Sequence, residues 1–400
     1  MSAEVLAGYL RAQATEFLRA LRLHREAGTG AAASQGSAEA ALALRRAARR
    51  ISGSLHTFQA VLDPGWSEAM RPELAWVSGT LALEHACSAR LERLLQALHR
   101  LSGTAALPAR GPAGAGPPGG SGGPGGAARS AAAVAARPGS APAGTGTTTT
   151  APERGSLTVG AAKAGALLDR QLTLARTRAH STALQALGSS RFHAVADKVA
   201  VLASEVPLSP AASATDLRPL AEAARERLVD AVAALPLLTA GSPYNAEALV
   251  HGLSPDPAPH PQDAPWHQVR LLLRLHRYAR EVLHRAAETS GAAGGAGTAA
   301  GAEPTAPLAA VVPAPTTVFP AAPPVAPPHD LRLIVAGEAL DRHRDASEAS
   351  AAAAHAARTP RIAPATAYAL GVLHADQRHE VEAARYAFQL GWQKDVLGSS

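Results

Sequence analysis

The sequence has 400 residues and a formal net charge of +6, and only one of those residues is a cysteine, which excludes an internal disulfide framework and a cysteine-based zinc finger. Of its 38 basic residues 35 are arginines, and arginine is the side chain best suited to bidentate contacts with phosphate. Hydrophobic residues make up 47% and aromatic residues only 4%, so the core must consist mainly of alanine, leucine and valine. Alanine and leucine favour helices, and the composition therefore predicts an all-α fold.

The chain begins with a pattern that predicts three amphipathic helices, over residues 2–27, 37–62 and 66–101. In each of them apolar residues recur at spacings of three and four, which is the period of one helix face. Gly28 ends the first helix, since glycine commonly follows a helix C-terminus. The second helix carries two pairs of arginines in which the partners lie one turn apart, Arg45 with Arg49 and Arg46 with Arg50.

Two stretches, residues 103–155 and 289–328, consist almost entirely of glycine, alanine, proline, serine and threonine. Such segments bury too little apolar surface to offset the entropy lost on ordering, so we predict two disordered linkers. The glycines of the first stretch do not form a phosphate-binding loop, because no strand precedes them and no Gly-Lys-Ser/Thr follows.

Six further helices are predicted outside these stretches. They begin near Leu157, Gly188, Thr215, Ala264, Leu331 and Pro364. The helix from Ala264 to Arg285 is the most basic of them, with five arginines between Asp263 and Arg285. Asp263 is its predicted N-cap, and Pro265 lies just inside its first turn.

One stripe of this basic helix carries a histidine and three arginines: His267, Arg270, Arg274 and Arg277. At ~100° per residue these four side chains fall within roughly 80° of one another on the helix circumference. Among the stripe arginines only Arg277 has an acid one turn away, Glu281. The stripe is therefore either a solvated basic face or a site for an anion.

The spacing His267-x-x-Arg270-x-x-x-Arg274-x-x-Arg277-Tyr278 resembles the second-half signature of the CHAD family, the conserved histidine α-helical domain. The first arginine helix resembles the first-half signature, with Arg49 and Arg50 on its terminal pair and Arg45 on its first arginine. Leu42 stands where that signature has its histidine. In the third helix, His85 and Ala86 replace the Arg-Asp pair that the family usually has there.

The resemblance implies an all-α fold of two pseudo-symmetric helical bundles around a basic groove. The first half would be residues 1–102 and the second half residues 156–288, with residues 329–393 completing the second half. The linkers 103–155 and 289–328 would separate these units.

The family is one of polyphosphate-binding modules, so the resemblance implies non-catalytic binding of inorganic polyphosphate or a similar polyanion. Nine residues are the implied site: Arg45, Arg46, Arg49, Arg50, His267, Arg270, Arg274, Arg277 and Tyr278. No cofactor is expected.

Other chemistry finds less support in the residues. The histidines nearest a metal-site pattern, His374 and His379, point about 140° apart on a helix, so no metal site is expected. We expect no enzymatic activity either, because Asp341, Asp345 and Glu348 are predicted to be single charges on a helix exterior rather than an inward-facing set that holds Mg²⁺.

Two alternatives stay open, a generic phosphate-backbone binder and a helical protein-interaction adaptor with proline-rich ligand segments such as Pro320-x-x-Pro323. Duplex DNA is disfavoured, because neither a helix-turn-helix spacing nor interleaved basic and aromatic residues occur. We find no apolar run of signal-peptide or membrane-span length, and therefore expect a cytoplasmic protein that does not enter a membrane. The sequence leaves the oligomeric state open.

Overall fold

The computed structural model describes residues 3–26, 31–103, 151–237, 240–242, 249–250, 253, 260–295 and 328–393. Within these ranges the fold is all-α, as predicted, and the one extended pairing there is an isolated antiparallel bridge between Leu62 and Leu208. None of the helices described in these ranges is long and apolar enough to cross a membrane.

The described residues form nine α-helices and two short 3-10 helices, and their order follows the order predicted from the sequence. They are α1 (Ala3–Glu26), α2 (Ala31–Thr57), η1 (Gln59–Val61), α3 (Pro64–Ser102), α4 (Ala151–Leu187), α5 (Ser190–Ser204), α6 (Leu217–Ala233), η2 (Pro261–Asp263), α8 (Ala264–Gly295), α9 (Pro328–Ala357) and α10 (Pro364–Gln393).

Two helices extend into the stretches predicted as linkers. Helix α4 begins at Ala151 and α8 continues to Gly295. Pro152 lies in the first turn of α4, where proline is tolerated. Residues 104–150 and 296–327, the rest of the two predicted linkers, lie outside the described residues.

Capping residues explain several helix ends. The Asp63 carboxylate accepts a hydrogen bond from the backbone N–H of Trp66 at 2.7 Å, and Pro64 occupies the first position of α3. At the other end of α3, Gly103 adopts the left-handed conformation with φ of 67°, which glycine reaches without a steric penalty. The side chains of Ser189 and Asp216 cap α5 and α6 in the same way as Asp63.

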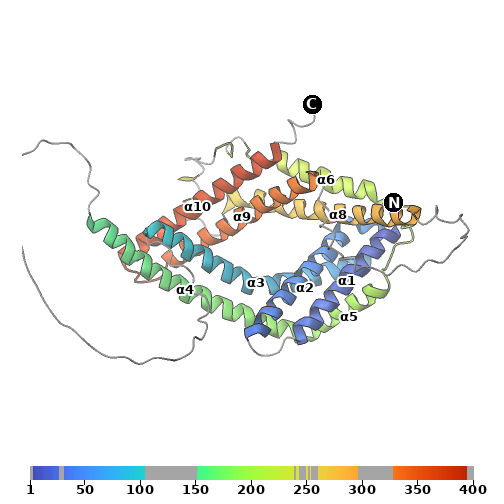
Figure 1. Ribbon diagram of the computed structural model, residues 1–400, viewed down its shortest axis with the longest axis horizontal. Helices are drawn as coiled ribbons and strands as arrows, with labels where there is room; N and C mark the ends of the chain where they lie inside the picture. The colour runs from blue at the N-terminus through green and yellow to red at the C-terminus, as the bar shows by residue number, and fades with distance from the viewer. Residues whose placement is uncertain are drawn as a thin grey trace, which may run out of the picture.

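The helices form a frame of paired neighbours (Figure 1). Helix α9 runs along α10, α3 along α4, α1 along α2 and α5, and α6 along α8. Three hydrophobic cores hold this frame together. The first lies among α1, α2 and α5, the second joins the end of α3 to α4, α9 and α10, and the third joins α6 and the start of α8 to α9 and α10.

Large, fully buried side chains anchor these cores, including Phe17, Phe58 and Phe192 in the first and Trp266 and Phe388 in the third. Burying one such side chain stabilises the fold by roughly 1.5–3 kcal/mol. The first two cores each combine helices from both predicted sequence halves, since α5 packs on α1 and α4 packs on α3. The pseudo-twofold relation between the halves stays a prediction.

Gly53 allows α2 and α8 to approach closely. A Cβ atom at this position would lie 2.6 Å from Cδ2 of Tyr278 and 3.3 Å from a methyl group of Leu275. The ring of Tyr278 therefore occupies the space that a side chain at residue 53 would need. This contact fixes the distance between the two helices that carry the predicted arginine pattern.

Candidate anion-binding pocket

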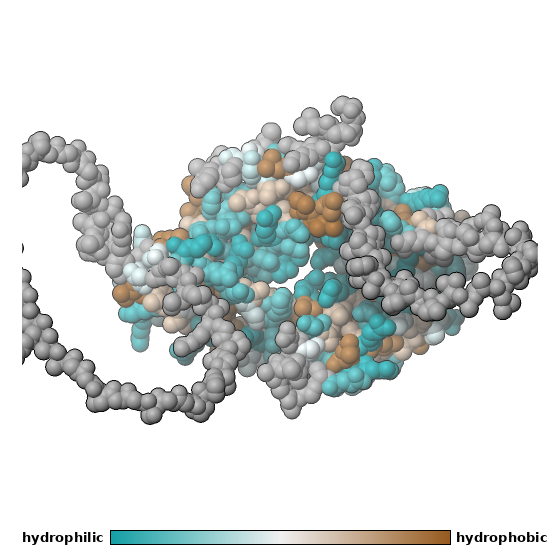
Figure 2. All heavy atoms as spheres, viewed as in Figure 1, coloured by the Kyte–Doolittle hydropathy of each residue, from teal (hydrophilic) through white to brown (hydrophobic). Residues whose placement is uncertain are grey.

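A pocket of about 320 Å³ lies among α2, α3, α8 and α9. Six arginines line it: Arg45, Arg49, Arg90, Arg93, Arg270 and Arg344. Hydrophilic side chains gather on both sides of a hollow near the middle of the molecule (Figure 2). Because Arg45 and Arg49 lie one turn apart on α2 and Arg270 enters from α8, the pocket joins the two basic helices that the sequence analysis singled out.

Three arginines at this pocket, Arg45, Arg49 and Arg274, have no ion pair with a carboxylate in the described part of the chain, and we call them the unpaired arginines. Arg274 does not line the pocket, but its charge acts on Arg45 and Arg49. Arg49 Nε donates to Ser78 Oγ at 3.1 Å, while Arg45 Nε is buried without a hydrogen-bond partner.

Crowding of like charges marks this group electrostatically. Burial lowers the pKa of Arg49 to about 9, and the charges of Arg45 and Arg274 act in the same direction. Burial likewise lowers the pKa of Arg45 and of Arg274, and the neighbouring Arg270 adds to both shifts. An anion among these guanidinium groups would relieve the repulsion and satisfy the free donors.

Three other arginines pair with the carboxylates of α9, and we call them the paired arginines. Arg270 Nε lies 2.5 Å from Asp341 Oδ1, and Arg90 Nη2 lies 2.6 Å from Glu348 Oε2. Arg344 lies 3.1 Å from Glu348 and 3.2 Å from Asp345.

Asp341 and Asp345 are more than half exposed, as expected for a helix exterior, but the expectation of single charges needs correction, because both line the pocket together with Glu348. Their spacing of four and then three residues places them on one face of α9. That face borders the pocket because neighbouring helices pack beside it, which the sequence of α9 alone does not reveal.

Several predicted site residues lie away from the pocket. Arg46 is exposed and donates to the carbonyl oxygen of Leu42 at 3.4 Å. Arg50 forms an ion pair of 2.8 Å with Glu281, which also accepts the hydroxyl of Tyr9 at 2.9 Å. These contacts tie α1, α2 and α8 together and leave Arg50 outside the pocket lining.

The last two residues of the predicted stripe face neighbouring helices. Arg277 lies beside Gly337 of α9, where an added Cβ would be 3.5 Å from Nη1 of the arginine. Tyr278 packs its ring against Gly53, and burial raises the pKa of its hydroxyl. Neither residue lines the pocket.

His267 lies beside the pocket rather than in its lining. Its ring is half-buried and meets the ring of His343 edge-on, with the ring centroids 5.5 Å apart. Its Nε2 is buried and lacks a hydrogen-bond partner in the structure. Burial lowers the pKa of His267, and although the charge of Asp263 opposes that shift, the direction remains downward.

Sequence reasoning missed three of the lining arginines, Arg90, Arg93 and Arg344. Arg90 and Arg93 lie on the face of α3 that also brings His85 and Ala86 to the pocket, so the departure from the family pattern at those two positions falls inside the site. The available signal was the spacing of Ala86, Arg90 and Arg93 by four and then three residues, which places them on one helix face.

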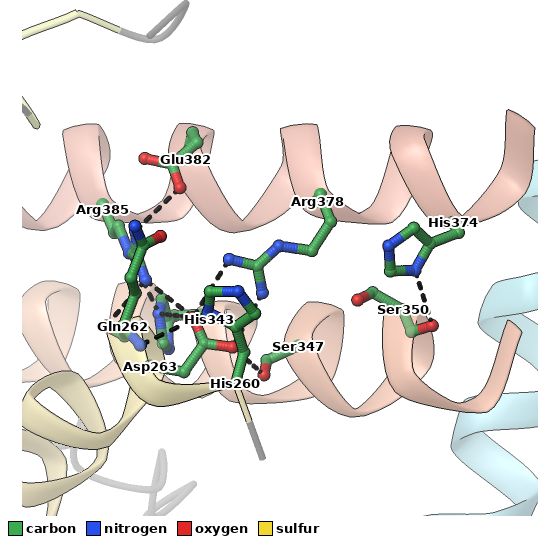
Figure 3. Close-up of polar contacts among 10 residues, drawn as sticks. All are labelled: His260, Gln262, Asp263, His343, Ser347, Ser350, His374, Arg378, Glu382 and Arg385. Carbon is green, nitrogen blue, oxygen red and sulfur yellow. Dashed lines mark hydrogen bonds and ion pairs between the residues drawn. The ribbon is translucent and has the colours of Figure 1, made fainter. Parts of the chain in front are cut away.

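A buried polar network lies between η2, α9 and α10 (Figure 3). The fully buried carboxylate of Asp263 accepts hydrogen bonds from Arg378 at 2.8 and 3.3 Å, from Arg385 at 2.7 Å and from Ser347 Oγ at 2.5 Å. Asp263 directly precedes α8, at the position predicted for its N-cap, but its carboxylate binds side chains of α9 and α10. Arg385 also donates to Glu382 at 2.8 Å.

The charges of this network compensate one another. Burial alone raises the pKa of Asp263, but the hydrogen bond and charge of Arg378 outweigh it and lower that pKa to about 2. Burial places the pKa of His343 well below the ordinary value, and the charge of Arg385 adds to the shift. Arg385 Nε donates to His343 Nε2 at 3.3 Å, which leaves the proton of the neutral ring on Nδ1.

No cluster of three or more histidine, cysteine, aspartate or glutamate side chains with metal-binding geometry occurs among the described residues. Of the histidine pair considered from the sequence, His374 faces α9, where its Nδ1 lies 3.0 Å from the carbonyl oxygen of Ser350 (Figure 3).

The fold and the site define an all-α protein with an arginine-lined pocket between four helices. The family model described as "CHAD domain" matches residues 12–296, and the chain therefore belongs to the CHAD family. The match ends before α9 and α10, although α9 supplies part of the pocket.

The chain is also similar along its length to a solved structure, PptA from Streptomyces chartreusis. The two sequences are 59% identical over 98% of this chain and 99% of that chain, and the TM-score is 0.67. Among curated proteins, none matches this chain.

Proposed function

We propose that this protein binds inorganic polyphosphate, or a similar flexible polyanion, in the pocket among α2, α3, α8 and α9, and that it does so without catalysis. The observation that carries the proposal is the group of unpaired arginines, Arg45, Arg49 and Arg274, whose charges are crowded and lack a carboxylate. Membership of the CHAD family supports the choice of ligand, since the resemblance implies a polyphosphate-binding module.

The chemistry of the ligand fits the pocket. Each phosphoryl unit offers oxygens that accept two parallel hydrogen bonds from one guanidinium group, and arginines on facing helices would contact successive units of one chain. A pocket of about 320 Å³ admits a thin, flexible chain, whereas a stiff nucleic-acid duplex is too wide to enter it.

The arrangement of acids supports binding without hydrolysis. The carboxylates in the pocket each lie within an ion pair with an arginine, as Asp341 does with Arg270 and Glu348 with Arg90. Phosphoryl transfer requires groups that position the nucleophile and neutralise charge on the leaving oxygen, commonly with Mg²⁺ held by carboxylates. A cytoplasmic location, which was the expectation from the sequence, belongs to the same proposal.

Two double variants test the proposal, Arg45→Ala with Arg49→Ala on α2 and Arg270→Ala with Arg274→Ala on α8. A charge-assisted hydrogen bond is worth about 1.5–3 kcal/mol, so each double variant should weaken polyphosphate binding by well over tenfold in calorimetry. Both should remain folded by circular dichroism, because alanine is at least as good a helix former as arginine.

The matched control removes two arginines outside the pocket, Arg191→Ala with Arg225→Ala, and should leave the affinity within about twofold. Unchanged binding in both pocket variants would refute the proposed site. Equal affinity for polyphosphate and duplex DNA at equal phosphate concentration would instead favour the alternative hypothesis, that the protein binds phosphate backbones of any kind.

A further inference from the structure

Three of the six arginines that line the pocket pair with the acidic face of α9, and Arg93 pairs instead with Glu380 of α10 at 3.6 Å. Arg45, Arg49 and Arg274 are the unpaired arginines. Each of the paired arginines contacts a carboxylate of α9: Arg270 with Asp341 at 2.5 Å, Arg90 with Glu348 at 2.6 Å, and Arg344 with Glu348 at 3.1 Å. The two sets adjoin, because the charges of Arg270 and Arg344 both act on Arg45.

The ion pairs with α9 are of the kind that exchanges readily. The side chain of Asp341 is 59% exposed and that of Glu348 is 37% exposed, so both carboxylates can turn towards solvent. Partly exposed ion pairs add little to stability. A phosphoryl oxygen that replaces the carboxylate oxygen would restore the same kind of charge-assisted hydrogen bond to the arginine.

We propose that the paired arginines Arg90, Arg270 and Arg344 form a second anion subsite, which the carboxylates of Asp341 and Glu348 occupy in the free protein and which a polyphosphate chain fills by displacing them. This inference rests on the proposed function and adds a selection for chain length to it. Asp341 and Glu348 act as internal competitors, and they are specificity-determining residues rather than ligands for a cation.

Chain length decides which ligands reach the second subsite. A short anion satisfies the unpaired arginines without breaking any ion pair. A long chain held at the unpaired arginines presents its next phosphoryl units to the paired arginines at a high effective concentration, which drives the exchange. Removing the carboxylates therefore strengthens the binding of long chains more than the binding of short ones.

Asp345 adds to the crowded negative charge on this face, although its side chain is 52% exposed. Burial raises the pKa of Asp345, and the charges of Glu348 and Asp341 act in the same direction against that of Arg344. The acidic face is thus held in place by its arginine partners. Once a phosphate chain takes those partners, the carboxylates gain by moving out towards water.

The test compares the wild type with Asp341→Asn, Glu348→Gln and the double variant, using tripolyphosphate and a long-chain polyphosphate as ligands in calorimetry. The substitutions keep the shape of each side chain and remove its charge. The double variant should bind the long chain roughly threefold to fivefold more tightly, the range set by the loss of exposed ion pairs, with a smaller gain for tripolyphosphate.

A carboxylate outside the pocket provides the control. Glu73 pairs with Arg191 at 2.7 Å between α3 and α5, and Glu73→Gln should change neither affinity. An equal gain for both ligands, no gain, or weaker binding of the long chain in the double variant overturns the second subsite. Should Glu348→Gln lower the thermal midpoint, Asp341→Asn alone decides the question.

The same experiment separates this inference from the proposed function. If the wild type binds neither ligand, or if the double arginine variants bind as the wild type does, the proposed function itself fails. If those variants lose binding while the acid variants leave the long-to-short affinity ratio unchanged, only the second subsite fails.

Discussion

Two groups of arginines in this molecule, one partly buried and one fully buried, differ in their counter-charges. Beside the pocket, Arg45, Arg49 and Arg274 have no carboxylate partner among the described residues. In the network between η2, α9 and α10, Arg378 and Arg385 share the buried carboxylate of Asp263, and Arg385 also binds Glu382. Both groups are arginines on α-helices, but only those of the second group form ion pairs with carboxylates.

This difference separates arginines that hold the fold from arginines that await a ligand. Arg378 and Arg385 are 2% and 5% exposed, and their hydrogen bonds join η2 to α10 across 115 and 122 residues of sequence. A buried charge of that kind depends on its partner, since its desolvation is compensated only by the pairing. The unpaired arginines keep their desolvation and mutual repulsion uncompensated, and a bound polyanion would supply the missing charge.

The largest expected effect comes from making one substitution in both groups, Arg378→Met and Arg274→Met. At Arg378 the change leaves the buried Asp263 carboxylate with one arginine fewer, and we expect a loss of about 3–5 kcal/mol in the free energy of unfolding. At Arg274 the change removes a crowded charge, and we expect stability to stay constant or rise.

Urea denaturation measures both effects on stability. Polyphosphate affinity should show the reverse ranking, with the larger change in Arg274→Met. Arg274→Met should weaken binding, whereas Arg378→Met should leave the affinity of the folded protein close to the wild-type value. Equal destabilisation by the two substitutions would show that the comparison between paired and unpaired arginines is wrong.

The sequence predicted the helices and part of the pocket because those features are local. Every described α-helix was predicted, the first three of them from apolar periodicity, and arginine spacing on α2 and α8 singled out Arg45, Arg49 and Arg270, which line the pocket. Arg46 shows the limit of that reasoning, because it shares the arginine-rich segment of α2 with Arg45 but points to solvent.

The remaining features depend on contacts between distant segments. Asp263 and Arg378 are 115 residues apart, so a local pattern identified Asp263 only as a helix cap. The position of the α9 carboxylates at the pocket likewise follows from the packing of α3 and α8 beside that helix. Charge pairing in this protein is a tertiary property, and spacing along one helix does not reveal it.

A smaller effect should appear in the pH dependence of stability, and it tests the buried network between η2, α9 and α10. Burial holds the pKa of His343 well below the ordinary histidine value of 6.5. Below that pH the imidazole of His343 is protonated in the unfolded chain but neutral in the folded protein. The free energy of unfolding therefore falls as the pH drops through about 6.5. The carboxylate of Asp263, with its pKa of about 2, stays ionised throughout this window.

Thermal unfolding of the wild type between about pH 8 and pH 5 should show this loss, and His343→Gln should reduce it. Glutamine offers an oxygen that accepts the hydrogen bond from Arg385, so the variant keeps that contact at neutral pH. A variant that retains the full pH dependence would show that another group takes up the proton.

The smallest effect concerns His267. Its ring contacts His343, and Arg270, which belongs to the same stripe of α8, lines the pocket. Burial lowers its pKa, so the ring is neutral near pH 7 in the free protein. A polyanion in the pocket favours the imidazolium form, and binding should therefore take up protons and strengthen by roughly twofold to threefold as the pH falls from about 8 to 6. His267→Gln should flatten that profile in calorimetry, while His193→Gln on α5 should not. A pH dependence that survives in His267→Gln would assign the proton to the carboxylates of α9, because burial raises the pKa of Asp345 from its ordinary value. That outcome would remove His267 from the site and leave the division between paired and unpaired arginines intact.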